Sequence, residues 1–317
     1  MNQLTFRNGD QLDAIGLGTW KSEPGEVYGA IRAAIKAGYT HIDCAWIYQN
    51  EDEIGKALAD AFAEGDTTRE QLFITSKLWN SFHHPDDVED ALDKSLNALQ
   101  LEYLDLYLMH WPIAHKKDEI FPEKADGFVT LDEIPLTATW RAMEQLVDTG
   151  KVKHIGVSNF NIPKLEGLMK EAQIAPEMNQ VESHPLLAQN ELLEFCKKNE
   201  ILYTAYSPLG SRDRAENVKG EDEPDMFENA TIQQIAEKHQ VHPAQILIKW
   251  AESRGTAVIP KSVNPERIAK NLQSADIPLS QEDMQALNGL DQGFRYLNGK
   301  FWEREGGYYT AEMLWKH

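Results

Sequence analysis

Short apolar segments alternate with amphipathic ones along this chain, and that alternation limits its possible folds more than any other feature. Eight apolar segments are typical of strands: residues 14–17, 39–45, 72–78, 103–109, 153–157, 176–181, 201–206 and 257–259. The segments typical of helices include residues 27–37, 85–99, 137–149, 162–172, 190–198, 231–238 and 243–253. Strands interleaved with helices in this way form parallel βαβ units. The pattern therefore predicts an α/β protein with a parallel sheet.

An open doubly wound sheet and a closed eight-stranded barrel both fit this order of elements. An open sheet that binds a dinucleotide has the pattern Gly-x-Gly-x-x-Gly after its first strand. Here Gly16 and Gly18 begin that pattern, but Lys21 stands at the position of the third glycine. No segment rich in Pro, Gly or Ser divides the chain into two domains. We therefore predict one TIM (β/α)8 barrel domain over residues 1–317, a length that suits such a barrel with long insertions.

A β-hairpin is predicted ahead of the first of these strands. Apolar residues 4–6 and Leu12 lie on either side of the dipeptide Asn8-Gly9. A type I′ turn requires positive φ at both central positions, and Asn-Gly is the pair that meets this requirement most readily. We therefore expect both Asn8 and Gly9 to adopt positive φ.

The acidic composition excludes several classes of partner. The chain has 31 Lys and Arg against 51 Asp and Glu, which gives a formal net charge of −20. Nucleic acids and anionic membrane surfaces are bound through basic patches, so neither is an expected partner. Two cysteines fit a reducing compartment. The first residues lack the features of a signal peptide, and no apolar run approaches the roughly 18 residues of a membrane span. We expect a soluble, cytoplasmic monomer.

Polar side chains at the ends of the strands are the candidates for chemistry, because reactive groups of such barrels lie at the C-terminal ends of the strands. Four of them meet at one rim: Asp43 and Tyr48 after the second strand, Lys77 at the end of the third, and His110 after the fourth. An ammonium at the apolar end of a strand requires a counter-charge, which Asp43 on the neighbouring strand can supply.

These four side chains together suit the reduction of a carbonyl group. A tyrosine with its ordinary pKa of about 10 is a poor acid at neutral pH, but a nearby ammonium lowers that pKa. We expect Lys77, held ionised by Asp43, to do this to Tyr48. His110 can donate a hydrogen bond to a carbonyl oxygen and orient it. Each residue alone has an ordinary structural explanation, but their coincidence at one rim favours an acid and an orienting group for hydride transfer.

Metal-dependent hydrolysis is the alternative chemistry for this rim. His41 and Asp43 face the same side of a strand, and His110 and His184 also lie near strand ends. A catalytic metal site requires at least three such ligands around one open position. Lys77 would repel a divalent ion, and His41 lies one pleat deeper than the rim. We therefore expect no metal.

Six segments in order make the sequence similar to the aldo-keto reductase superfamily, and within it to the aldose and aldehyde reductases. They are residues 16–20, 41–45, 106–112, 155–160, 205–210 and 259–262. The resemblance implies a barrel with the hairpin capping its bottom and long substrate loops at the C-terminal face. It implies a catalytic tetrad at Asp43, Tyr48, Lys77 and His110, and reduction of aldehydes and some ketones with NADPH. Some relatives are channel subunits or lens proteins, but the intact tetrad favours an enzyme.

The resemblance also implies where NADPH or NADP+ lies. Tyr206 would offer its ring to the nicotinamide, the carboxamide would contact Ser158, Asn159 and Gln180, and the ribose would face Thr19, Trp20 and Asp43. Lys21 and Asp213 match residues that fasten a loop over the pyrophosphate. The other residues matched to the cofactor are Ser207, Leu209, Ser211, Lys261, Ser262, Val263, Asn264, Arg267 and Asn271.

The group around Lys261 supports the NADPH prediction on physical grounds as well. Basic and hydroxyl groups at the start of a helix form a phosphate site, and Arg267 can bind a 2′-phosphate through two hydrogen bonds. We therefore expect NADPH to be preferred over NADH. The chain departs from its relatives at Lys270, which stands where they have Glu before the residue matched by Asn271.

Five aromatic residues are expected to line the substrate pocket around Tyr48 and His110: Trp20, Trp79, Trp111, Phe121 and Trp302. Aromatic walls around a few polar groups suit a carbonyl compound with an apolar body. Loops 113–136 and 211–229 and the tail from residue 292 should shape the specificity, and the charged 211–229 loop should act as a mobile lid. We expect a small-molecule aldehyde to be favoured over a bulky ketone.

Overall fold

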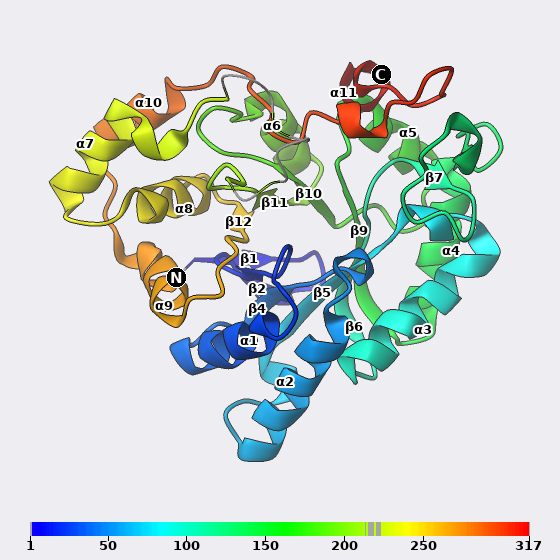
Figure 1. The fold of residues 1–317 in the computed structure, drawn as a ribbon, viewed down its shortest axis with the longest axis horizontal. Helices are drawn as coiled ribbons and strands as arrows, with labels where there is room; N and C mark the ends of the chain where they lie inside the picture. The colour runs from blue at the N-terminus through cyan, green and yellow to red at the C-terminus, as the bar shows by residue number, and fades with distance from the viewer. Residues whose placement is uncertain (1, 213, 215–218, 220–222, 317) are drawn as a thin grey trace.

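The computed structural model describes residues 2–212, 214, 219 and 223–316, and its centre is one parallel sheet (Figure 1). The eight strands follow the order β12-β11-β10-β9-β6-β5-β4-β3. Their bounds are β3 Leu17–Gly18, β4 His41–Asp43, β5 Phe73–Leu78, β6 Leu104–Met109, β9 Val152–Ser158, β10 Met178–Glu182, β11 Leu202–Tyr206 and β12 Ala257–Val258. Each of the eight predicted strands overlaps one of these.

The two outer strands of this sheet meet and close it into a barrel. Ile15 pairs with Val258 and Gly18 pairs with Lys261, both in parallel register. Backbone hydrogen bonds from Gly16 N to Val258 O (2.9 Å) and from Val258 N to Ala14 O (2.7 Å) join the same segments. The prediction of a closed (β/α)8 barrel is therefore confirmed.

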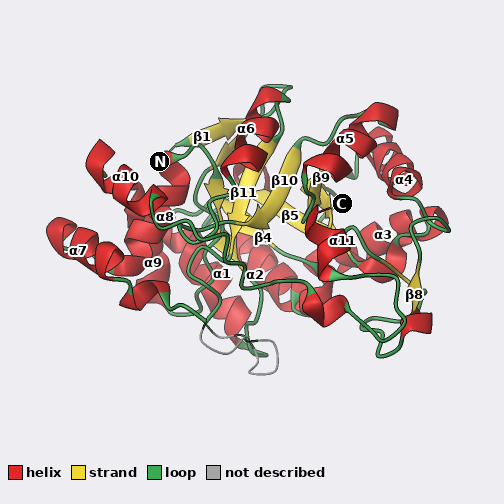
Figure 2. Ribbon diagram, turned by 90° about the horizontal axis from the view of Figure 1, so that it is seen from above, coloured by secondary structure: helices red, strands yellow, loops and turns green. Residues whose placement is uncertain are grey.

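Helices surround the strands, as Figure 2 shows in a view turned by 90°. Their bounds are α1 Glu26–Ala37, α2 Glu51–Glu64, α3 Val88–Leu99, α4 Leu136–Asp148, α5 Ile162–Glu171, α6 Asn190–Lys198, α7 Ala230–His239, α8 Pro243–Ser253, α9 Pro265–Gln273, α10 Gln281–Asn288 and α11 Ala311–Lys316. Helix α3 illustrates why they form: its buried residues recur every three or four positions, at Val88, Ala91, Leu92, Ser95, Leu96 and Leu99. That spacing gives one apolar face that packs on the sheet.

A hairpin of β1 (Gln3–Thr5) and β2 (Gln11–Asp13) covers the N-terminal end of the barrel, as predicted. Leu4, Phe6 and Leu12 pack there against residues at the strand starts, including Phe73. The predicted turn geometry is wrong, because Gly9 has positive φ (96°) but Asn8 does not. The Asn8 side chain instead accepts a hydrogen bond from Asp10 N (2.9 Å), a local bond that Asn forms readily in turns.

The opposite end of the barrel carries the long connections. The loop after β6 contains a small hairpin of β7 (Ala114–His115) and β8 (Phe128–Val129). Helix α11 belongs to the tail, and the 211–229 loop is described only in part, so its predicted motion as a lid lies outside the described residues. Within the described part of the chain, no helix combines the length and apolar character of a membrane span.

Candidate active site

Lys77 is the most deeply buried member of the four rim residues, with no exposed side-chain surface. Its ammonium donates to Asp43 Oδ1 (2.5 Å), to the backbone oxygen of Cys44 (2.7 Å) and to the Tyr48 hydroxyl (3.4 Å). These three acceptors match the three donors of an ammonium. Burial favours the neutral amine, but the neighbouring Asp43 carboxylate and Tyr48 hydroxyl outweigh it and raise the pKa of Lys77. The amine therefore stays charged.

Tyr48 lies at the end of a short 3-10 helix, Trp46–Tyr48, which follows β4 and turns the phenol toward the rim. Burial raises the pKa of this phenol to about 12, and the opposing charge of Lys77 is the smaller influence. The prediction that Lys77 and Asp43 lower the pKa of Tyr48 is therefore wrong as a net effect. Lys77 does act in the expected direction, whereas the carboxylate of Asp43 raises the pKa further.

His110 follows β6, and its ring meets the ring of Tyr48 edge-on, with 5.9 Å between the centroids. Burial and the neighbouring Lys77 charge hold the pKa of His110 well below its usual range. The imidazole is therefore neutral and carries one N–H. Nδ1 of His110 is buried and has no hydrogen-bond partner among the described residues.

A chain of hydrogen bonds crosses the mouth of the barrel from Asp43. Gln180 Nε2, at β10, donates to the second oxygen of Asp43 (2.7 Å), and Ser158 Oγ donates to the backbone oxygen of Gln180 (2.7 Å). The Asn159 amide bonds Ser158 Oγ (3.2 Å) and accepts from the Tyr206 hydroxyl (2.7 Å). Four of the residues matched to the nicotinamide end of the cofactor are therefore neighbours in one network.

Thr19 and Trp20 adjoin this network. Thr19 Oγ1 donates to the backbone oxygen of Asp43 (2.8 Å), and the Trp20 ring lies 6.5 Å from that of Tyr48. Lys21 Nζ lies 4.7 Å from the centroid of the Trp20 ring. Asp213, which was expected together with Lys21 to help fasten a loop over the pyrophosphate, lies outside the described residues.

The residues expected to hold the nucleotide phosphate gather at the start of helix α9. Asn264 caps this helix by accepting from Arg267 N (3.0 Å), and Ser262 Oγ accepts from Asn264 N (3.2 Å). Arg267 is exposed, and Lys261 follows β12 beside them. Val263, which is half-buried, and Asn271, which is buried, belong to the same segment. Three more of the expected cofactor residues follow β11: Leu209 is half-buried, and the hydroxyls of Ser207 and Ser211 lie 2.5 Å apart.

Two further basic groups lie at this helix. Burial, together with the charges of Arg267 and Lys270, lowers the pKa of His242. Lys270 forms an exposed ion pair with Glu266 (2.7 Å) one turn earlier. A helix start with exposed basic residues is the arrangement that binds phosphate groups, so these residues fit a phosphorylated nucleotide.

Four of the five aromatic residues predicted to line the pocket lie together, whereas the fifth, Trp20, is in ring contact with Tyr48. Trp302 lies 5.8 Å from Trp79 and 5.7 Å from Trp111, measured between ring centroids. Trp79 lies 5.4 Å from Phe121 and 5.2 Å from His110. Phe121 is 60% exposed. The wall therefore runs from the rim outward to solvent.

The sequence argument missed three residues of this wall. The His115 ring lies 5.2 Å from Trp302, Phe128 lies 4.9 Å from His115, and Tyr309 lies 5.7 Å from Phe128. His115 and Phe128 belong to two-residue strands inside a long loop, which are too short for an alternating pattern to reveal. Tyr309 lies in the tail, for which the motifs supplied no match.

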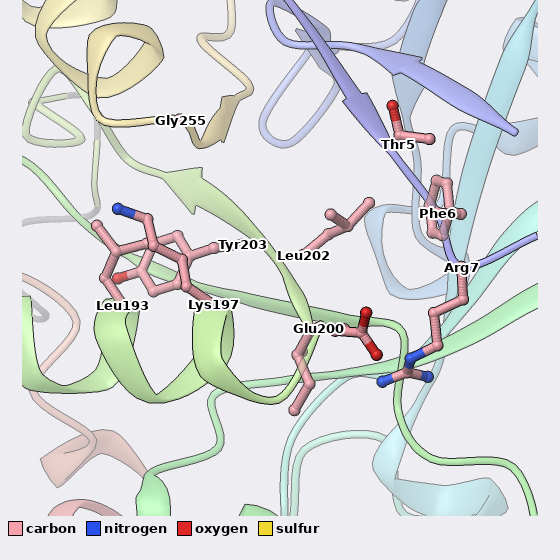
Figure 3. Close-up of a pocket in the computed structure, with 10 residues that line it drawn as sticks. Thr5, Phe6, Arg7, Leu193, Lys197, Glu200, Leu202, Tyr203 and Gly255 are labelled. Carbon is pink, nitrogen blue, oxygen red and sulfur yellow. The ribbon is translucent and has the colours of Figure 1, made fainter. Parts of the chain in front are cut away.

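A separate cavity of about 420 Å³ lies at the N-terminal end of the barrel, between the hairpin and helix α6 (Figure 3). Its lining includes Thr5, Arg7, Lys197 and Glu200 and none of the four rim residues. The guanidinium of Arg7 donates there to backbone oxygens, among them that of Pro176. This cavity is therefore remote from the candidate chemistry. Within residues 2–212, 214, 219 and 223–316, no three His, Cys, Asp or Glu side chains are placed to hold a metal ion.

Comparison with known proteins gives consistent matches over nearly the whole chain. The sequence model of the Aldo/keto reductase family matches residues 14–292. An aldo/keto reductase of Synechocystis sp. is 49% identical over 315 residues, which cover 99% of this chain and 96% of that protein. Aldo-keto reductase family 1 member A1 of Mus musculus is 48% identical, over 97% of this chain and 96% of that protein. The solved structure of the aldose reductase from Schistosoma japonicum is similar with a TM-score of 0.87 and 38% identity, over 97% of this chain and 99% of that one.

Proposed function

The chain belongs to the aldo/keto reductase family, and we propose that it reduces aldehydes, and some ketones, to alcohols with NADPH and with Tyr48 as the proton donor. The observation that carries this proposal is the buried Lys77 ammonium, which donates to Asp43 and to Tyr48 at once. A buried charge is costly unless it is paired. The barrel interior thus holds a fixed positive charge next to a phenol, where it stabilises the phenolate that remains once the proton has left.

Each of the four residues has a separate task in this proposal. The Tyr48 hydroxyl holds the proton, which moves to the carbonyl oxygen of the substrate. His110 is neutral and donates its one N–H to that oxygen, which orients the carbonyl. Asp43 keeps Lys77 charged and in place. The aromatic wall excludes water from the reacting carbonyl and binds the apolar body of the substrate.

The described residues fit NADPH. Ser158, Asn159 and Gln180 would hold the nicotinamide end beside the rim, and Lys261 and Arg267 would hold the 2′-phosphate at the start of helix α9. Burial lowers the pKa of His242 most, but Arg267 and Lys270 both lower it as well, and these two positive charges would favour a phosphate at that helix. When bound, NADPH supplies the hydride for the carbonyl carbon.

The substitution Tyr48→Phe tests the role of the phenol. We expect oxidation of NADPH in the presence of an aromatic aldehyde to fall at least a thousandfold, by about 4 kcal/mol of barrier, while the dissociation constant for NADPH changes less than about twofold. Tyr28→Phe is the matched control, because its phenol bonds Asp60 on the outer helices (2.7 Å). A Tyr48→Phe enzyme with turnover close to that of the wild type would refute the proposal.

We also propose that residues 1–317 act as one barrel domain and as a cytoplasmic monomer. Cys44 and Cys196 are free and buried, which suits a reducing compartment. Size-exclusion chromatography with light scattering should give a single species close to 36.0 kDa. A stable dimer at low micromolar concentration would contradict this.

A further inference from the structure

Tyr309 joins the tail of the chain to the small hairpin over the barrel mouth. Its hydroxyl accepts a hydrogen bond from the backbone N–H of Ala114 (2.9 Å), in β7, and donates one to the backbone oxygen of Val129 (2.8 Å), in β8. Tyr309 is 2% exposed. One phenol from a distant part of the sequence therefore bonds both strands of the hairpin, using both the donor and the acceptor capacity of its hydroxyl.

We call Tyr309, with its two hydrogen bonds to the hairpin, the clasp. Its ring also contacts the aromatic wall of the predicted substrate pocket. The Tyr309 ring lies 5.7 Å from that of Phe128, which lies 4.9 Å from that of His115. His115 in turn lies 6.0 Å from Trp79, the neighbour of His110. Aromatic rings thus form an unbroken series from the clasp to the rim.

The tail and the 113–136 loop are held together at further points. Arg304 Nε, in the tail, donates to the backbone oxygen of Pro122 in the loop (2.9 Å). The end of the tail is fastened to helix α5, because Lys164 Nζ donates to the backbone oxygens of Met313 (2.8 Å) and Leu314 (3.1 Å). The tail is therefore anchored to the barrel beyond Tyr309, and the loop is anchored to the tail.

We propose that Tyr309 is a specificity-determining residue: it holds the β7–β8 hairpin and the tail as one rigid wall that selects carbonyl compounds with a large apolar body. Tyr309 is a positioning residue, since it acts through Phe128 and His115. The inference rests on the proposed reductase function and concerns the same site.

The selectivity follows from the cost of ordering a surface when a substrate binds. An aromatic aldehyde reaches the wall as well as Tyr48 and His110, whereas a three-carbon aldehyde reaches only those two. A wall that is already ordered binds the larger substrate without that cost. The substitution Tyr309→Phe removes the hydrogen bonds from the phenol to Ala114 N and Val129 O, and the loss of two buried hydrogen bonds favours conformations in which the hairpin moves away from the tail.

The test compares benzaldehyde with propanal in the wild type and in Tyr309→Phe. We expect kcat/KM of Tyr309→Phe for benzaldehyde to fall about tenfold, mainly through a higher KM, because apolar pocket contacts change kcat/KM by factors of about 10 to 200. For propanal, which does not reach the wall, kcat/KM should change less than about twofold. The dissociation constant for NADPH should not change. Tyr28→Phe, which also loses a hydrogen-bonded phenol, should leave both rates unchanged. Equal losses for the two aldehydes, or none, would overturn the inference.

Hydrogen exchange measured by mass spectrometry provides a readout that needs no activity. In Tyr309→Phe, peptides covering residues 113–129 and 301–316 should exchange faster together, and peptides from strands β4 to β6 should not. Unchanged exchange in either segment would also overturn the inference. If the wild type reduces neither aldehyde, the proposed reductase function fails and the selectivity claim fails with it. If the wild type reduces both aldehydes but Tyr309→Phe leaves the ratio of their kcat/KM values unchanged, the role of Tyr309 is refuted and the proposed reductase function is not.

Discussion

His154 provides a quantitative test of how the hairpin is fixed to the bottom of the barrel. Its ring is 1% exposed and stacks on Phe6 with 3.9 Å between the centroids. Nε2 bonds Asp10 Oδ2 (3.0 Å) in the hairpin, and Nδ1 bonds Glu177 Oε2 (2.9 Å) ahead of β10. Burial alone would lower the pKa of His154, but the bonds and charges of Glu177 and Asp10 outweigh it and the pKa is raised. The ammonium of Lys153 is the other charge near this group, and it lowers the pKa of Asp10.

The substitution His154→Phe keeps the stacked ring and removes both bonds. Hydrogen bonds to charged groups contribute about 1.5–3 kcal/mol each, and the half-exposed Asp10 side chain places its bond at the low end of that range. We therefore expect a loss of about 3 kcal/mol at pH 6. An unfolding entropy of about 2.1 cal/mol/K per residue, about 0.7 kcal/mol/K for this chain, converts that loss to a fall in Tm of about 4–5 °C.

The loss of stability caused by His154→Phe should become smaller as the pH rises. The pKa of His154 is raised in the folded protein above its unfolded value of about 6.5. The stabilisation from the bound proton is therefore complete below about pH 6.5 and disappears as the pH rises through the folded pKa. Thermal unfolding followed by circular dichroism between about pH 6 and 9 should show the difference in Tm between wild type and variant becoming smaller.

The control for this experiment is His84→Gln, because the His84 side chain is 55% exposed. Its difference in Tm from the wild type should be small at every pH. If the difference in Tm between the wild type and His154→Phe stays constant over the whole pH range, the argument that a protonated His154 joins the hairpin to the barrel is refuted.

Two further predictions concern the cofactor and the closure of the barrel. Arg267→Ala should raise the dissociation constant for NADPH about a hundredfold, because it removes two charge-assisted hydrogen bonds, and should leave that for NADH unchanged in fluorescence titrations. Equal effects on both cofactors would argue against a 2′-phosphate contact. Gly16→Ala should destabilise the fold by about 3 kcal/mol in urea unfolding, because the added Cβ would lie 2.5 Å from Nδ1 of the buried His41 ring; a variant as stable as the wild type would show that this ring can move aside.

The barrel and its rim could be predicted because both follow from local signals. The eight strands are apolar segments of the expected length, and a strand that ends in Asp43 or leads to His110 brings its polar residue to the same rim as its neighbours. The pairing of Lys77 with Asp43 follows from the cost of an unpaired buried ammonium. None of these steps requires knowledge of distant contacts.

What the sequence did not predict depends on long-range contacts or on a balance of opposed effects. The Tyr309 clasp joins residues 195 and 180 positions apart, and nothing in the local sequence encodes such a pair. The prediction of positive φ at Asn8 was wrong because the Asn8 side chain accepts a hydrogen bond from Asp10 N instead. The prediction that the pKa of Tyr48 is lowered was wrong because burial, which depends on the whole fold, raises this pKa more than Lys77 lowers it.

That last correction strengthens the proposed chemistry. Burial holds the Tyr48 phenol protonated across the neutral range, so the proton donor is present when a substrate binds. Lys77 donates only a long bond to the phenol (3.4 Å) and a short one to Asp43 (2.5 Å). In the proposed reaction the phenol oxygen would gain negative charge as the proton leaves, and its attraction to the fully buried Lys77 ammonium would grow. In the proposed mechanism Lys77 would therefore stabilise the reacting state more than the resting one, and only such a difference accelerates a reaction.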